Sequence, residues 1–303
     1  MQKRINIILV LLMVITVTLT GCRNLEVKES SKNNVKNLGN SPRIVATSMS
    51  VVEIMDKLNV DLVGVPESKV DKLPKRYKGT KKVGSAMSPD MEKLKALNPD
   101  LVLSPVSLLP DLLPKYRNQE IEYGFLNLNN IEGMYKSIDD LGILLHREKE
   151  ARKLRQDYES YMKNFREKHK EGKHPKVLIL MGLPGSYVVA TDKSYAGSLV
   201  EMAGGKNVYK SKDKQFVNVN VEDMLKREPD IILRTSHAMP EKVKEMFAEE
   251  FKTNDIWKNF KAVSSDRVYD LGNKHFGMSA KFNYPEALER LEEIFYGEAF
   301  EEE

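Results

Sequence analysis

Met87 and His237 combine residue types that bind transition metals with positions in loops before predicted helices. A thioether sulfur and an imidazole nitrogen are both ligands for iron. His237 follows a predicted strand that ends at Arg234, and ligands of α/β proteins bind at the carboxyl ends of strands. If two lobes face each other across a cleft, each wall supplies one of the two side chains.

Other roles and other side chains compete with this pair. Ser88 and Pro89 predict a helix start, so Met87 lies where a hydrophobic residue normally packs on the fourth helical residue. That residue is Glu92, which leaves Met87 without a packing partner. His237 has the alternative role of capping the helix at Pro240. The rival ligands are His275, Met239, Met278 and Met91, and Met91 is expected inside a helix.

The segments that must position these loops form two similar halves. The Pro-Asp pairs at 99–100 and 229–230 each precede an apolar strand, and seven residues before each proline stands a glutamate, Glu92 or Glu222. The pattern indicates an internal duplication. Because strands alternate with helices in both halves, we predict two α/β lobes with parallel sheets.

A charged stretch from Arg147 to Lys170 separates the halves. It contains neither Gly nor Pro, and its apolar residues recur at gaps of three and four, which predicts one amphipathic helix about 35 Å long. We therefore expect an N-terminal lobe at 42–146, a connecting helix at 147–172 and a C-terminal lobe at 173–303.

The start of the chain indicates export. Residues 1–21 have a basic beginning and an apolar run typical of a signal peptide. The motif before Cys22 resembles a bacterial lipobox, which implies lipid attachment at that residue. Residues 22–41 are polar and are expected to form a flexible tether. Cys22 is the only cysteine, so the sequence excludes an internal disulfide.

Charge, motifs and the positions of the histidines argue against three kinds of function. Loss of Lys3 and Arg4 with the signal leaves 46 basic residues against 44 acidic ones, too even a balance for nucleic-acid binding. The sequence has no Gly-x-Ser-x-Gly, His-Glu-x-x-His or phosphate-loop motif, which argues against an enzyme. A zinc or manganese receptor would need converging histidines and carboxylates, whereas His146, His169 and His174 lie in or beside the connecting helix.

Four stretches carry a resemblance to a known family: HPKVLILMGLPGSYVVATDKSY, GSAMSP, LRTSHAMPE and EEFKTNDIWKNFKAV. With the lipobox, the two lobes and the long helix, they resemble class III substrate-binding lipoproteins of ABC importers, in particular the heme-binding members. The resemblance implies transported heme b with Met87 and His237 as axial ligands. No Cys-x-x-Cys-His is present, so heme would be bound without covalent bonds. An iron-siderophore or cobalamin receptor of the same fold is the alternative.

Heme also needs an apolar wall and partners for its propionates. Leu108 and Leu109 are candidates for the wall, and helix N-terminal N–H groups bind anions. The propionate candidates are Met49, Ser50, Ser68 and Lys69.

The resemblance further implies a set of partners. Glu92 and Glu222, one in each lobe, would dock on an ABC permease that works with an ATPase. Upstream cell-surface heme-binding proteins would supply the cargo. The protein is expected to be a monomer, anchored by lipid on the extracytoplasmic face of the cell membrane.

Overall fold

The computed structural model describes residues 38–39, 41–68, 71–169, 172, 174–237 and 239–297. The predicted signal peptide, Cys22, nearly all of the predicted tether and Lys69 lie outside the described residues. The described residues from Gly39 to Gly297 belong to one compact unit.

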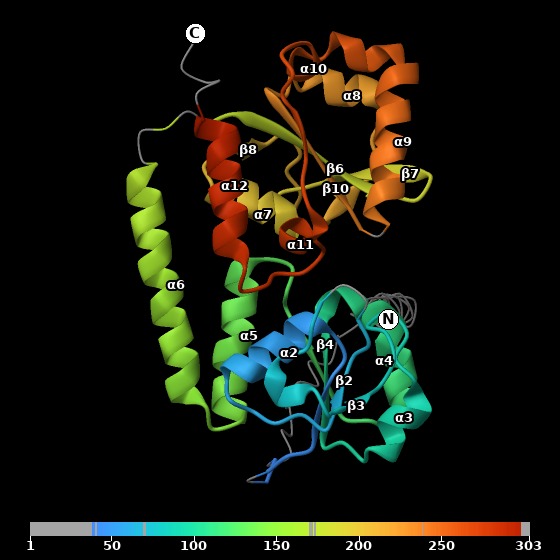
Figure 1. The fold of residues 1–303 in the computed structure, drawn as a ribbon, viewed down its shortest axis with the longest axis vertical. Coiled ribbons are helices and arrows are strands. Elements are labelled where there is room, and N and C mark those ends of the chain that lie inside the picture. The colour runs from blue at the N-terminus through green and yellow to red at the C-terminus, as the bar shows by residue number, and fades with distance from the viewer. Residues whose placement is uncertain are drawn as a thin grey trace, which may run out of the picture. The chain divides into compact units, whose positions relative to one another are not determined.

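The N-terminal lobe is built on a parallel sheet of five strands in the order β3-β2-β1-β4-β5 (Figure 1). The strands are β1 (Ile44–Ala46), β2 (Gly64–Val65), β3 (Lys81–Lys82), β4 (Leu101–Pro105) and β5 (Tyr123–Leu126). The helices are α2 (Met49–Lys57), η1 (Lys75–Tyr77), α3 (Met91–Ala96), η2 (Val106–Leu108), α4 (Leu109–Asn118) and α5 (Ile131–Leu144). All of β4 is buried, as expected for a central strand with helices on both faces.

The C-terminal lobe has a mixed sheet in the order β11-β10-β6-β7-β9, with β8 pairing to β6. Its strands are β6 (Lys176–Leu183), β7 (Ser186–Ala190), β8 (Lys206–Asn207), β9 (Phe216–Val217), β10 (Ile231–Ser236) and β11 (Val268–Asp270). The expected parallel pairing joins β8, β6, β10 and β11. A hairpin adds the antiparallel strand β7, because Pro184 and Gly185, whose φ is 82°, turn the chain back after β6. The strand β9 then pairs antiparallel with β7.

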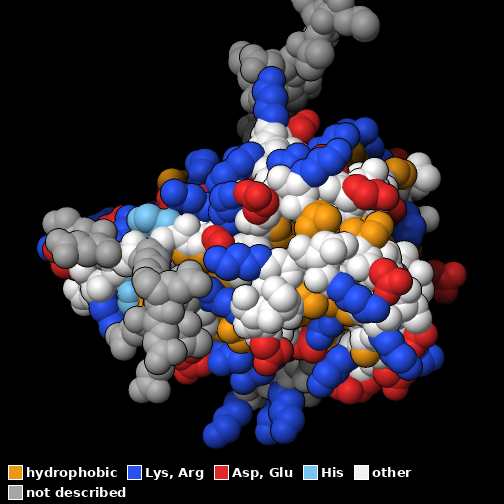
Figure 2. Space-filling model, turned by 90° about the horizontal axis from the view of Figure 1, so that it is seen from above, with side chains coloured by type: hydrophobic (Ala, Val, Ile, Leu, Met, Phe, Trp, Pro, Cys, Tyr) orange, Lys and Arg blue, Asp and Glu red, His pale blue; other side chains and the backbone are white. Residues whose placement is uncertain are grey.

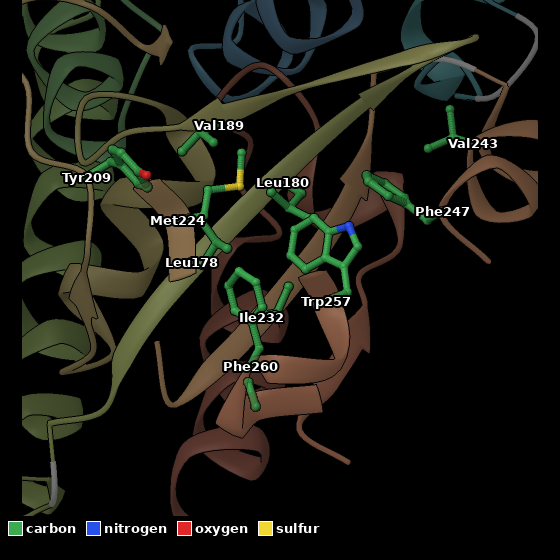
Figure 3. Packing of buried hydrophobic residues seen from close by; sticks show 11 residues of the cluster. Leu178, Leu180, Val189, Tyr209, Met224, Ile232, Val243, Phe247, Trp257 and Phe260 are labelled. Carbon is green, nitrogen blue, oxygen red and sulfur yellow. The ribbon is translucent and has the colours of Figure 1, made fainter. Parts of the chain in front are cut away.

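Helices cover this sheet and enclose an aromatic core. They are α7 (Tyr195–Met202), α8 (Val221–Lys226), α9 (Pro240–Thr253), η3 (Asp255–Asn259), α10 (Lys261–Ser264), α11 (Asn273–Phe276) and α12 (Tyr284–Tyr296). Trp257 is fully buried and stacks on Phe260, with ring centroids 4.7 Å apart (Figure 3). It also stacks on Phe251, at 4.2 Å. Its indole N–H donates to Glu250 at 3.0 Å. Trp257 therefore has a structural role.

The charged stretch forms helix α6 (Glu148–Lys168), which packs on α5 (Figure 1). Tyr158 of α6 stacks on Tyr135 of α5 at 4.4 Å, and both rings meet Tyr284 of α12 edge-on. Lys168 forms an ion pair with Glu292 of α12. Contacts from α6 therefore reach both α5 and α12. The residue bounds of the lobes given above stay a prediction.

The surface mixes charges of both signs. Figure 2 shows Lys and Arg side chains interspersed with Asp and Glu over one face of the molecule.

Within the described part of the chain, no helix is both long enough and apolar enough to cross a membrane.

Candidate ligand-binding site

A pocket of about 310 Å³ is lined by residues of both lobes. The N-terminal lobe contributes Met49, Ser50, Pro66, Glu67, Ser68, Asp71 and Ala86. The C-terminal lobe contributes His237, Asn273, Lys274, Gly277, Met278, Ser279 and Lys281. Its volume is in the range of small-molecule and cofactor sites.

His237 enters this pocket from the carboxyl end of β10, an interior strand of the C-terminal sheet that lies between β11 and β6. Its backbone N–H donates to the carbonyl of Gly182 on β6 at 3.0 Å, which ties the loop to the sheet. The Nδ1 atom of its ring is buried and has no hydrogen-bond partner among the described residues. Because buried polar atoms are normally paired, this imidazole is suited to an external ligand.

The structure contradicts the capping role for His237. Helix α9 begins at Pro240, and its N-cap residue is Met239, which adopts a left-handed conformation with φ of 50°. Among the described residues, no side chain forms a capping hydrogen bond with this helix. The imidazole is therefore not used by the helix that follows it.

Met87 lies in the loop before α3, next to the pocket residue Ala86, and 62% of its surface is exposed. The predicted helix cap at Ser88 is wrong. Asp90 is the N-cap, and its carboxylate accepts the N–H groups of Glu92 and Lys93 at 3.1 and 3.0 Å.

The register of the loop explains that error. Pro89 does not begin the helix, because it forms a β-bridge with Gly84 and is buried. Relative to Asp90, the residue before the cap is Pro89, and the fourth helical residue is Leu94, which is buried. Met87 thus lies outside the hydrophobic-staple position altogether. An exposed methionine in this loop has no core-packing role.

The proposed propionate contacts fall partly in the pocket. Met49 and Ser50 are the first two residues of α2, and Ser68 lines the same pocket. The N-cap Ser48 accepts only the N–H of Val51, at 3.3 Å, and the first N–H groups of a helix have no intrahelical acceptor. This helix end can therefore bind an anion. Lys69 is outside the described residues.

Leu108 and Leu109 do not line the pocket in the structure. The segment expected as a loop is helical, with Leu108 in η2 and Leu109 opening α4. Leu108 packs against the core of its own lobe instead. The sequence could not show this, because apolar residues after a strand suit either a pocket wall or a short helix.

The rival ligands are placed differently from one another. Met278 lines the pocket, and Met239 is exposed over 56% of its surface. Met91 packs on the N-terminal core, as expected for a helix residue. His275 does not line the pocket, and its Nδ1 lies 3.3 Å from the amide nitrogen of Asn283. Met278 is thus the strongest competitor of Met87.

Sequence reasoning missed an ion pair in the pocket. The ammonium of Lys281 lies 3.1 Å from both carboxylate oxygens of Asp71. The two residues are 210 positions apart and belong to different lobes, so no local pattern joins them. The described residues also contain no group of three or more His, Cys, Asp or Glu placed to hold a metal ion.

Glu92 and Glu222 occupy matching positions. Each is the second residue of a six-residue helix, α3 or α8, and each side chain is exposed. Each helix is capped at its start by the side chain of Asp90 or Asn220.

Two α/β lobes with a shared pocket and a long helix beside them define a substrate-binding protein of the ABC-importer type. The chain belongs to the periplasmic binding protein family, whose model matches residues 44–275. The predicted class III fold is confirmed. This family consists of transport proteins that bind a substrate.

Among its relatives is the high-affinity heme uptake system protein IsdE of Staphylococcus aureus (strain Newman). The two are 43% identical over 289 residues, which are 95% of this chain and 97% of the relative. Among solved structures, an ABC transporter substrate-binding protein from Listeria monocytogenes EGD-e matches with a TM-score of 0.81 and 47% identity, over 84% of this chain and 99% of that chain. S. aureus IsdE complexed with heme matches with a TM-score of 0.80 and 44% identity, over the same shares.

Proposed function

We propose that this protein is a receptor that binds heme without covalent attachment and delivers it to an ABC importer for iron acquisition. The observation that carries the proposal is the buried, unpartnered Nδ1 edge of His237 in a pocket lined by both lobes. A relative that covers nearly the whole chain is named for heme uptake, and its structure contains heme. Heme is the cargo, and no catalytic role is assigned to any residue.

Within this function, His237 and Met87 are the axial ligands of the iron. Imidazole is a common heme ligand, and an added thioether raises the reduction potential because it favours ferrous iron. The exposed thioether of Met87 is free to turn toward a ligand in the neighbouring pocket. Met278, which lines the pocket, is the alternative thioether.

The first turn of α2 binds the propionates. Met49 and Ser50 present backbone N–H groups at the positive end of a nine-residue helix. Ser68 adds a hydroxyl on the same pocket surface, and Lys69 is a further candidate. The porphyrin faces would then contact the apolar parts of Pro66, Ala86 and Met278, in place of the leucines first expected.

The cellular setting belongs to the same proposal. Lipid at Cys22 would hold the receptor on the extracytoplasmic face of the membrane, as a monomer. Glu92 and Glu222 would contact the permease, whose ATPase drives uptake, and cell-surface heme-binding proteins would supply the cargo. The exposure of both glutamates supports this role.

The decisive experiment mixes the purified protein, lacking its signal peptide, with hemin and separates it on a sizing column. We expect a Soret band that co-elutes with the protein at one heme per chain. Ferric hydroxamate siderophore and cobalamin serve as matched alternative ligands. Retention of either one, with no retention of heme, would replace this function by that of another receptor with the same fold.

A further inference from the structure

Asp71 and Lys281 join the two lobes inside the ligand pocket. Asp71 lies in the N-terminal lobe between β2 and η1, and Lys281 lies in the C-terminal lobe between α11 and α12. The Lys281 ammonium is 3.1 Å from both Oδ atoms of Asp71, and both residues line the same pocket as His237. A ligand in this pocket therefore lies beside the ion pair.

The main chain around Lys281 is fixed, while its side chain can turn. Ala280 donates its N–H to the carbonyl of Leu128 in the other lobe at 2.8 Å. Phe282 packs edge-on against Tyr135 of α5, with ring centroids 6.3 Å apart. A lysine ammonium on such an anchored backbone can exchange partners by rotation of its flexible stem alone.

The environment of Lys281 requires a counter-charge. Only 20% of its side chain is exposed, so the ammonium has lost much of its water and is stable only beside an anion. Glu53 of α2 is a second carboxyl group nearby. Burial raises the pKa of Glu53, while the positive charge of Lys281 lowers it and the negative charge of Asp71 raises it. Both acidic side chains thus interact with the Lys281 ammonium, and Lys57 is a second cation that acts on Glu53.

We propose that Lys281 is a further cargo-binding residue, and that a heme propionate replaces Asp71 as its partner. A propionate and an aspartate side chain are both carboxylates, so the exchange substitutes one charge-assisted hydrogen-bonded pair for another of the same kind. Asp71, with 29% of its side chain already exposed, would return to water. The inference rests on the proposed function. It implies that the site selects porphyrins with free carboxylates.

A permanent link between the lobes is the competing explanation of the same ion pair. If the link persists in the loaded protein, removal of either partner breaks it and affects cargo binding equally. If the partners exchange, the two removals have opposite effects. Loss of Lys281 removes a cargo contact, whereas loss of Asp71 removes a competitor of the cargo.

The test measures the affinity of protoporphyrin IX and of its dimethyl ester by porphyrin fluorescence. Neither compound contains iron, so axial ligation does not contribute. For Lys281→Leu we expect about a tenfold loss of affinity for the free acid, the size of one charge-assisted hydrogen bond, and no loss for the ester. Asp71→Asn should bind the free acid several-fold more tightly, and Lys281→Arg should retain wild-type affinity. Lys57→Leu is the control, because Lys57 contacts the ring of Phe282 at 5.6 Å but does not line the pocket.

Equal losses for the Lys281→Leu and Asp71→Asn variants, or equal losses of acid and ester, would overturn the exchange. If Lys281→Leu fails to fold by circular dichroism, Asp71→Asn decides alone, and weaker binding of the free acid by that variant contradicts the proposal. If the unaltered protein retains no hemin on the sizing column, the proposed function fails. If it retains hemin and the variants leave the acid-to-ester ratio of porphyrin affinities unchanged, only this inference fails.

Discussion

Asp100 and Asp230 make the same pair of backbone contacts at equivalent points of the two lobes. The Oδ2 atom of Asp100 accepts the N–H of Arg43 at 2.7 Å, and its own N–H donates to the Arg43 carbonyl at 2.8 Å. Asp230 does the same with Lys176, at 2.8 Å for both bonds. Each aspartate thus joins the start of one central strand to the start of the next, which explains why the Pro-Asp pair recurs.

The axial pair gives the first prediction. His237→Ala should weaken heme retention and change the ferric absorption spectrum, because it removes the imidazole that is free in the pocket. Met87→Ala should perturb the ferrous spectrum more than the ferric one, since a thioether prefers the softer ferrous iron. The measurement is absorbance of both oxidation states.

His275→Ala is the matched control for that experiment, and it should keep the wild-type spectra if Met87 and His237 ligate the iron. Met278→Ala tests the alternative thioether: because Met278 contacts the porphyrin, its loss should weaken heme binding without the change in the ferrous spectrum expected for Met87→Ala. A wild-type ferrous spectrum for Met87→Ala, together with an altered one for Met278→Ala, would transfer the thioether role to the residue that lines the pocket.

The second prediction concerns lobe motion. The rings of Tyr135 and Tyr284 meet edge-on at 6.3 Å, their hydroxyl groups are 3.3 Å apart, and Tyr158 stacks on Tyr135. This packing joins α5, α6 and α12, so little hinge closure is expected on loading. Small-angle X-ray scattering should give the same radius of gyration for free and heme-loaded protein. A clear decrease on loading would contradict the packing argument.

Glu250 supports a prediction about pH. Burial opposes its ionisation, but hydrogen bonds to its Oε1 atom from Trp257 and Asn254 at 3.0 Å and from Tyr187 at 3.1 Å outweigh that effect and lower its pKa. The folded protein therefore binds the Glu250 proton less tightly than the unfolded chain does. This stabilisation is present above the ordinary pKa of 4.5 and is lost as the pH falls through the lower folded value.

Glu250→Gln should accordingly lower the free energy of unfolding at pH 7 by about 2 kcal/mol, the scale of hydrogen bonds to a charged group. The difference from wild type should shrink as the pH falls below 4.5. Urea denaturation at several pH values measures it. Glu249→Gln, at the exposed neighbouring position, is the control, and an equal loss in both variants would refute the role of Glu250.

The sequence predicted elements better than it predicted contacts between them. The strand before His237 and the helix around Tyr158 could be predicted from the periodic spacing of apolar residues, because that pattern can be read from neighbouring residues alone. The cap at Asp90 was missed, because Ser88 and Pro89 match the local helix-start pattern and only the β-bridge to Gly84 shifts the boundary.

The pocket shows the same limit more sharply. His237 could be placed from the end of its own strand. The ion pair between Asp71 and Lys281 could not, because two ordinary charged residues 210 positions apart carry no shared local signal. The packing of α12 and of the segment before it against α5 brings them together.

The last prediction concerns the importer and depends on the equivalence of the two lobes. Glu92 lies two residues after the cap Asp90, and Glu222 lies two residues after the cap Asn220. The buried sides of these helices are anchored by Leu94 and Met224, which leaves both glutamates exposed. A matched pair of carboxylates, one on each lobe, suits a two-fold permease that presents an arginine to each. Such contacts position partners and speed association.

Reversal of both charges, Glu92→Lys with Glu222→Lys, should therefore abolish heme-dependent growth, while heme affinity and spectra stay unchanged. Each single reversal should cause a partial loss, because one of the two contacts remains. Glu228→Lys is the matched control, since Glu228 is also exposed and lies just beyond α8. Normal growth of the double variant would show that the permease recognises a different surface. An altered heme spectrum in the double variant would show instead that the charges act on the pocket.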